Sequence, residues 1–369
     1  MSEGGARKLR VGVLTFFEAN NCGANLQALA LTEAIGEMGA QCEIIRYRKE
    51  RPKVSQAFVR KKHGFRGSVH ELVVGCMAMQ RKKAFSHFRN KYMAMSRKEY
   101  FGEEILEANP RYDVFVTGSD QVWNDRLNEK DDTYFLNFVS EPSRKCAYAP
   151  SFGRNTVFSE ERAREVGEML ADFRLLSGRE EDAVRLIGEL SGRDALRVPD
   201  PVILRPRERW EQVAGEPSKK KPFIFLYTIN YTTPEMVRVI QAIEKRKKTE
   251  VIVHQRQLHH YVSGRHDFLM APDEFLRCVR DAEIILTDSY HATLFSILFH
   301  KNFWMFAWNR GKGYDARIAE VLEIYGQSAR WVQGELADPL LPADHQKTDE
   351  RVRAERERGL AFIREILYA

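Results

Sequence analysis

The stretch from residue 282 to residue 308 combines an apolar strand pattern with polar residues that could do chemistry. Residues 284–287 read as a buried strand, and Asp288 and Ser289 follow directly as residues that can cap a helix. His291 then falls in the first turn of that helix. This edge of an open parallel sheet binds ligands, because free backbone N–H groups and the positive helix terminus favour an anion. An imidazole there can face a phosphate as a cation or move a proton near neutral pH. Taken alone, the segment fits equally well a capped core helix with one polar residue at its end.

A second polar run, residues 118–124, follows the apolar strand pattern at 113–117. Amide and carboxylate groups can bracket sugar hydroxyls, and an indole can stack on a sugar face. Such a combination is unusual for a plain turn, so we favour a binding role. The candidate residues in this run are Ser119, Asp120, Gln121 and Trp123.

Two further groups also follow strands of the first half. Asn25 and Gln27 belong to a turn that opens a helix, where amides could bind a sugar or phosphate, although by itself the turn is an ordinary helix cap. Arg179 follows the strand at 174–177, and its guanidinium could clamp a carboxylate or phosphate. On its own, Arg179 reads more simply as a salt-bridged surface residue near a helix start.

A cationic, glycine-containing loop at 309–317 follows the strand after the histidine helix. Its cations are Arg310, Lys312 and Arg317. The loop could close over an anion at the same sheet edge, or it could be a solvated connection.

The strand and helix patterns alternate along the chain and predict two doubly wound α/β halves. We expect a first domain over residues 1–205, with a helical insertion at 50–100, and a second over 206–345. The charged stretch at 205–221 reads as a hinge or linker, and residues 346–369 as a closing helix packed back across the domains.

The helical insertion contains a basic stretch, residues 69–95, with interleaved apolar positions. Such a helix could lie on a membrane or cover a cleft. We favour a helix pair packed on the sheet edge with a solvated basic face.

Composition narrows the class of protein. The 369 residues, 43% of them hydrophobic, suit two domains with real cores. The net charge of +6 is spread along the chain, which favours an anionic small substrate or membrane surface over nucleic acid.

We expect no secretory signal and therefore a cytoplasmic protein, and the five scattered cysteines predict neither disulfides nor zinc. No metal-ligand spacing, phosphate-binding loop, dinucleotide fingerprint or hydrolase elbow is apparent.

Taken together, the polar clusters resemble the polysaccharide pyruvyl transferase family. The most specific pieces are GSDQVWN at 118–124 and DSYHATLFS at 288–296. The other matching pieces are NCGANLQALAL (21–31), YFLNFV (134–139), YAPSFG (148–153), SGREEDAVRL (177–186) and DPVIL (200–204). Their order along roughly residues 10–320 makes chance similarity improbable.

The resemblance implies two Rossmann-like domains that face each other across a cleft, as in GT-B glycosyltransferases, with the acceptor on the N-terminal side and the donor anion on the C-terminal side. It implies no cofactor, phosphoenolpyruvate as donor, and a sugar or lipid-linked glycan as acceptor. The product would be a cyclic pyruvate ketal in cell-surface polysaccharide biosynthesis. The enzyme would work in the cytoplasm, with peripheral contact at the inner membrane face as an option.

The resemblance also suggests roles for the candidate residues. His291 and Arg179 would hold the donor phosphate and carboxylate, with Arg317 or Lys312 completing the pocket. Asp288 or Asp120 would be the base, and the choice between them stays open. The acceptor would contact Asn25, Gln27, Gln121 and Trp123.

Two departures from the family pattern bear on the acceptor. Tyr290 and Ala292 flank the histidine where many members have Phe and Gly, and Arg317 stands where many have Lys. One rival hypothesis is a GT-B glycosyltransferase that uses a nucleotide sugar, because His291 could equally bind a nucleotide phosphate. A second is a non-catalytic scaffold of a glycan-assembly complex that docks through the basic helix.

Overall fold

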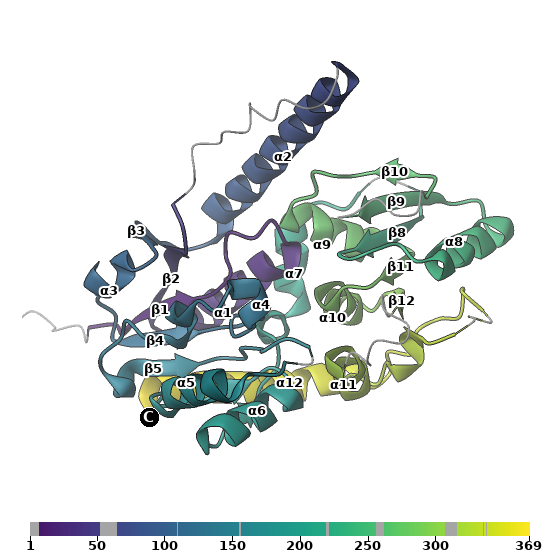
Figure 1. The fold of residues 1–369 in the computed structure, drawn as a ribbon. Coiled ribbons are helices and arrows are strands. Elements are labelled where there is room, and N and C mark those ends of the chain that lie inside the picture. The colour runs from purple at the N-terminus through teal and green to yellow at the C-terminus, as the bar shows by residue number, and fades with distance from the viewer. Residues whose placement is uncertain are drawn as a thin grey trace, which may run out of the picture.

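Two parallel sheets, each within its own set of helices, stand side by side in the computed structural model (Figure 1). The structure describes residues 7–51, 65–108, 110–154, 156–218, 221–255, 262–306, 316–334, 336 and 338–369. The α/β class expected from the alternating strand and helix patterns is confirmed. We call the part around the first sheet the first lobe and the part around the second sheet the second lobe.

The sheet of the first lobe has the strand order β3-β2-β1-β4-β5, with all neighbours parallel. Its strands are β1 (Arg10–Leu14), β2 (Gln41–Arg48), β3 (Met95–Phe101), β4 (Val114–Thr117) and β5 (Lys145–Ala147). Four of five residues in β1 and all four in β4 are buried, which explains their uninterrupted apolar runs. From β1 the chain continues to β2 and β3 on one side, and it then crosses over to β4 and β5 on the other side of β1. A switch point therefore lies between β1 and β4, where ligands bind in such sheets.

The sheet of the second lobe repeats this plan with the order β10-β9-β8-β11-β12-β13. Its strands are β8 (Phe223–Thr228), β9 (Glu250–Gln255), β10 (Arg265–His266), β11 (Ile284–Thr287), β12 (Asn302–Phe306) and β13 (Trp331–Val332). Here the switch point lies between β8 and β11. A two-stranded parallel sheet, β6 (Ser177–Gly178) with β7 (Leu196–Arg197), adds to the first lobe.

The helices cover the sheets and fill the space between them (Figure 1). The α-helices are α1 (Cys22–Glu37), α2 (Phe65–Tyr92), α3 (Glu104–Ala108), α4 (Asp125–Asn128), α5 (Glu160–Ala171), α6 (Glu181–Ser191), α7 (Arg207–Ala214), α8 (Pro234–Arg246), α9 (Pro272–Asp281), α10 (Tyr290–Leu298), α11 (Ala316–Ile324) and α12 (Thr348–Tyr368). Short 3-10 helices are η1 (Asp132–Phe135), η2 (Pro142–Arg144), η3 (Pro201–Leu204) and η4 (Ser328–Arg330).

Helix α1 joins the cores of the two lobes. It begins at an Asn21 cap, whose Oδ1 accepts hydrogen bonds from the backbone N–H groups of Gly23 and Ala24 at 2.9 and 3.4 Å. Most of its residues are buried, and Leu26 belongs to one apolar cluster with Phe275 of α9. A shared apolar core restrains the movement of one lobe against the other.

The charged stretch at 205–221 is more ordered than its composition predicts. It contains α7, and Trp210 of that helix is fully buried edge-on against Phe295 of α10, with ring centroids 5.1 Å apart. The Trp210 indole N–H also donates to the carbonyl oxygen of Val202 at 3.0 Å. The expected hinge is therefore a packed connection over this helix, because three apolar residues lie on one face of an otherwise charged segment.

The C-terminal helix α12 touches both lobes. Near its start, Asp349 lies 2.7 Å from Nε2 of His300 in the second lobe. Toward its end, Phe362 and Ile363 join the core of the first lobe, where Phe362 packs against Tyr148.

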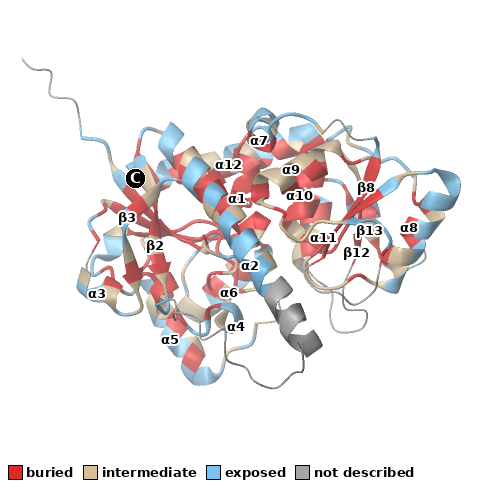
Figure 2. Ribbon diagram, turned by 90° about the horizontal axis from the view of Figure 1, so that it is seen from above, coloured by how far each residue is buried: buried red, intermediate tan, exposed pale blue. Residues whose placement is uncertain are grey.

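Helix α2 is a single helix that projects from the first lobe, not the helix pair we favoured from the sequence (Figure 1). The part next to the lobe is anchored through buried Phe85 and Phe88, and most of residues 75–83 are exposed (Figure 2). Within the described residues, none of the helices is both long enough and apolar enough to cross a lipid bilayer.

Candidate active site

A buried carboxylate, Asp200, gathers the charged residues at the junction of the lobes. Its Oδ2 accepts a hydrogen bond from Nη1 of Arg179 at 3.3 Å and lies 3.3 Å from Nε2 of His291. Arg179 comes from the first lobe and His291 from α10 of the second. Burial opposes ionisation of Asp200, but the nearby His291 and Arg179 charges and the hydrogen bond from Val202 N–H keep its pKa below the usual range. Asp200 is therefore an anion that links a cation of one lobe to an imidazole of the other.

Arg179 is held on several sides. Its Nε donates to Glu180 at 3.2 Å, and its Nη1 lies 3.5 Å from Asp120 in addition to the Asp200 contact. The guanidinium also stacks over the Tyr290 ring, 4.5 Å from its centroid. Only 2% of the side chain is exposed. The group is thus fixed in orientation, and three carboxylates surround its single charge.

His291 packs tightly against the start of α1. A Cβ on Gly23 would lie 2.2 Å from Nδ1 of the imidazole, so only glycine fits there. Nε2 of His291 is buried and has no well-aligned hydrogen-bond partner, so its contact with Asp200 is electrostatic. That nitrogen therefore has hydrogen-bonding capacity that the described residues leave unused.

Asp120 is the member of this group that opens to a cavity. It follows the switch point of the first lobe and has a φ of 70°, a conformation that Asp tolerates better than most residues. Its Oδ1 accepts the N–H of Gln121 at 2.9 Å, and 14% of its side chain is exposed. The preceding Gly118 is required, because a Cβ there would lie 2.2 Å from the carbonyl oxygen of Tyr148.

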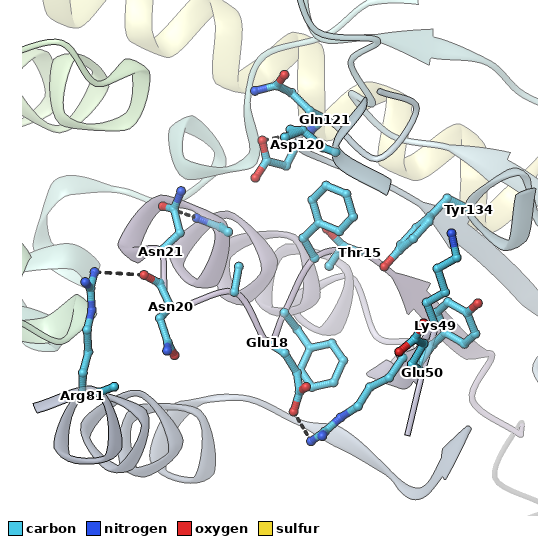
Figure 3. Close-up of a pocket in the computed structure, with 18 of the residues that line it drawn as sticks. Thr15, Glu18, Asn20, Asn21, Lys49, Glu50, Arg81, Asp120, Gln121 and Tyr134 are labelled. Atoms are coloured by element: carbon cyan, nitrogen blue, oxygen red, sulfur yellow. Dashed lines mark hydrogen bonds and ion pairs between the residues drawn. The ribbon is translucent and has the colours of Figure 1, made fainter. Parts of the chain in front are cut away.

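The cavity has a volume of about 1200 Å³ and lies at the carboxyl ends of the first-lobe strands (Figure 3). Asp120 and Gln121 form one margin, and the aromatic rings of Phe16 and Tyr134 pack edge-on in its wall with centroids 5.0 Å apart. The second lobe contributes Gln255 and Phe268. Aromatic surface with a few carboxylates and amides is the lining that suits a sugar.

A second, nearly closed crevice is lined by Arg179. It has room for about 10 Å³, about the least that can hold a single water. Arg197, Arg317 and Glu320 help to line it. The Glu320 carboxylate accepts the N–H of Glu181 at the start of α6, and burial raises its pKa to about 7. The crevice has no room for a substrate in this conformation, and Asp120 is the residue of the Arg179 group that lines the large cavity.

Three of the predicted acceptor residues, and the candidate binding residue Ser119, do not line the cavity. Trp123 is fully buried, stacked on Phe135 at 5.2 Å, so its indole cannot lie on a sugar. Asn25 and Gln27 are also fully buried, and the amide of Gln27 binds Thr15 Oγ1 at 2.9 Å. Ser119 is buried and donates to the carbonyl oxygen of Ala149 at 2.7 Å. These side chains hold the loops of the site in place through buried contacts. Gln121, in contrast, lines the cavity.

Asp288 and Ser289 have structural partners. The two carboxylate oxygens of Asp288 accept hydrogen bonds from the N–H groups of Ile229 and Asn230 and from the Asn230 amide, at 2.8 to 3.0 Å. Burial raises the pKa of Asp288. Ser289 caps α10 by accepting the N–H of Ala292 at 3.3 Å. Both therefore position the histidine helix, and Asp120 is better placed than Asp288 to act as a base.

The structure places only part of the predicted cationic loop. Arg310 and Lys312 lie outside the described residues, whereas Arg317 lines the crevice beside Arg179. The described residues contain no group of three or more His, Cys, Asp or Glu side chains arranged to hold a metal ion.

Sequence reasoning missed Asp200, Tyr290 and the aromatic lining of the cavity. Asp200 stands between two prolines in a turn, which reads as a helix cap, and indeed its Oδ1 accepts the N–H of Val202 at 3.1 Å. Its Oδ2 contacts both Arg179 and His291 only because the two lobes meet at this point. Phe16 and Tyr134 lie 118 positions apart and read as core residues.

Comparison with known proteins gives a family and a fold. A family model described as polysaccharide pyruvyl transferase matches residues 21–310. Among solved structures, the UDP-GlcNAc 2-epimerase of Methanocaldococcus jannaschii in complex with UDP-GlcNAc and UDP is similar with a TM-score of 0.53 and 14% identity, covering 98% of this chain and 100% of that one. S. aureus MnaA with UDP is similar with a TM-score of 0.53 and 11% identity, covering 96% and 90%. A search of the curated proteins found no match. At these identities the solved structures show the fold, which is of the two-lobed GT-B type.

Proposed function

Because the chain belongs to the polysaccharide pyruvyl transferase family, we propose that it moves the pyruvyl group of phosphoenolpyruvate onto two hydroxyl groups of a sugar, forming a cyclic ketal. The observation that carries the proposal is the junction at Asp200. There a guanidinium and an imidazole from different lobes meet one carboxylate, next to an aspartate that faces a cavity lined with aromatic side chains.

The reaction forms two C–O bonds at C2 of the donor, the first by addition and the second by displacement of phosphate. In the first, one sugar hydroxyl forms a C–O bond to C2, and the methylene carbon C3 takes a proton and becomes a methyl group. In the second, the other hydroxyl bonds to C2 while the bond from C2 to the phosphate oxygen breaks. Two hydroxyl protons are released; one proton ends on C3 and the other on phosphate or solvent. The protein must provide a base, an acid and positive charge near the leaving phosphate.

We assign the base to Asp120 and the acid to His291. Asp120 lies at the cavity margin, where it can take the proton of the first hydroxyl. Nε2 of His291, without an aligned partner, can give a proton to C3 and take one back from the second hydroxyl. Asp200 holds that imidazole toward the junction.

The donor carries a phosphate and a carboxylate, which require more positive charge than Arg179 can supply. Asp120, Glu180 and Asp200 already surround Arg179. We therefore assign further donor contacts to Arg317 beside the crevice, and to Arg310 and Lys312 outside the described residues.

The test is phosphate release from phosphoenolpyruvate in the presence of a panel of sugars and lipid-linked glycans, with the mass of each acceptor measured afterwards. We expect wild type to release phosphate with some acceptors and His291→Ala to release none above background. A parallel set of reactions offers nucleotide sugars. Transfer of sugar from these donors, without any reaction of phosphoenolpyruvate, would replace the proposal by a glycosyltransferase.

A further inference from the structure

The cavity extends well beyond the junction at Asp200. Its volume of about 1200 Å³ exceeds the roughly 300–1000 Å³ usual for a pocket that holds one small ligand. Figure 3 shows Asp120 and Gln121 at one margin and Arg81, beside Asn20, at another. The second lobe contributes Gln255 and Phe268 to the lining, and the charge of Arg81 acts on His254, the residue before Gln255. We call Arg81, Gln255 and Phe268 the distal group.

Arg81 differs from the other cations that line the cavity. Arg48 pairs with Glu18 and with Glu99, and Lys49 pairs with Glu129 at 3.4 Å. Among the residues that the structure describes, Arg81 has no carboxylate partner. Its Nη2 donates to the carbonyl oxygen of Asn20 at 3.0 Å, and its Nε is buried without any partner. A partly buried guanidinium with an unused donor is suited to an anionic ligand.

The positive charge of Arg81 reaches the second lobe. Burial, and after it the charge of Arg81, lowers the pKa of His254 to about 4. His254 is therefore neutral at physiological pH. Its ring stacks on Tyr227 and its Nδ1 lies 2.6 Å from the carbonyl oxygen of Asp267. Arg81 therefore lies near the carboxyl end of β9, and Gln255 is the last residue of that strand.

Gln255 provides the second unsatisfied group. Only 3% of it is exposed, and its Nε2 donates to Thr232 Oγ1 while its Oε1 has no partner. Whichever way the amide is turned, one of its two ends remains without a hydrogen bond. A buried polar atom without a partner destabilises the protein, and a ligand that binds this atom removes the destabilisation. A sugar hydroxyl can serve as donor or acceptor to either end.

Phe268 completes the distal group. Its half-buried ring stacks on His266 with centroids 5.7 Å apart and also lines the cavity. A sugar ring can pack against an aromatic face of this kind.

We propose that the distal group binds a phosphorylated saccharide, with the phosphate ester on Arg81 and the adjoining sugar on Gln255 and Phe268. This inference rests on the proposed function, because it identifies the far end of the acceptor whose diol reacts near Asp120. The acceptor is then a glycan that carries a phosphate or diphosphate ester at its reducing end.

The test is binding in the absence of phosphoenolpyruvate, with α-glucose 1-phosphate as probe and methyl α-glucoside as its neutral match. We expect wild type to bind the phosphorylated sugar about tenfold or more tightly than the neutral one, as for a charged hydrogen bond. Arg81→Gln should remove that preference. The matched control is Lys82→Gln, because Lys82 is the next residue on α2 and is exposed. It should bind both sugars as wild type does.

A second variant guards against misfolding of the first. Gln255→Glu keeps the side-chain shape and adds a negative charge, so it should weaken binding of α-glucose 1-phosphate more than binding of methyl α-glucoside. Equal binding of the two sugars to wild type, no binding of the phosphorylated sugar, or equal losses in Arg81→Gln and Lys82→Gln would each overturn the inference. Failure of the proposed function has a different signature, because the sugar phosphate would still bind while phosphoenolpyruvate released no phosphate.

Discussion

Asp120 in the first lobe and Asp288 in the second occupy equivalent places in their sheets and have different environments. Each follows the strand that pairs with the first strand of its lobe, at the switch point of the sheet. Asp120 faces a large cavity and lies 3.5 Å from Arg179. Asp288 has both oxygens occupied by the loop after β8.

This contrast shows that topology gives the place of a site but not its chemistry. An ionised carboxylate can act as a base only if a substrate can reach it. Amide donors from the loop after β8 fill the second-lobe position, whereas the first-lobe position stays open toward the cavity. We therefore expect one aspartate to matter for the reaction and the other for the fold.

The largest effect is expected for Asp120→Asn. The amide cannot accept a proton, so kcat should fall by about 10²- to 10⁴-fold, the usual contribution of a general base. The change keeps the shape of the side chain, and the melting temperature should stay close to that of wild type. A kcat within a few fold of wild type would remove Asp120 from the chemistry.

Asp200→Asn tests the link between the lobes. The change leaves buried Arg179 and His291 beside a neutral group, and we expect a loss of about 3 kcal/mol in the free energy of unfolding, measured with denaturant. Activity should fall as well, and the pH profile of kcat should change, because the imidazole loses its nearest anion. An unchanged pH profile together with unchanged stability would show that Asp200 does not link the two lobes.

Asp288→Asn should affect stability more than reaction rate. One end of the new amide must face backbone N–H donors, so at least one hydrogen bond is lost, at a cost of about 1–2 kcal/mol. Denaturant unfolding and kcat, measured on the same sample, separate the two effects. A loss of kcat as large as that of Asp120→Asn, without a loss of stability, would reverse the roles of the two aspartates.

The smallest effect on activity is expected for Glu320, a further carboxylate near the junction. Burial, together with nearby Glu180, raises its pKa from 4.5 to about 7 against the opposing Glu181 N–H bond. Because the folded-state pKa is the higher one, its contribution to stability is present below pH 4.5 and is lost as the pH rises through about 7. Glu320→Gln cannot ionise and should lack that loss. Melting curves of both proteins from pH 4.5 to pH 8 should diverge in favour of the variant, and parallel curves would contradict the assignment.

The sequence was sufficient for the fold and for the position of the strand-end clusters. The apolar runs that end shortly before Asp120 and Asp288 identify the carboxyl edges of two parallel sheets. The position of each edge can be predicted because it depends only on the local sequence pattern. Trp123 was misassigned, because its indole packs on Phe135, a residue of a later turn, and only the folded chain shows this contact. The bridging role of Asp200 could not be seen either, since it depends on how one lobe meets the other.

The most direct test of the central claim follows the oxygen that joins C2 of phosphoenolpyruvate to phosphorus. Wild type is incubated with an accepted sugar and with donor that carries heavy oxygen at that bridge. The account predicts that the heavy oxygen leaves with phosphate and that the sugar gains the mass of pyruvic acid minus one water. Heavy oxygen retained in free pyruvate, or a sugar that gains a phosphoryl group, would contradict it.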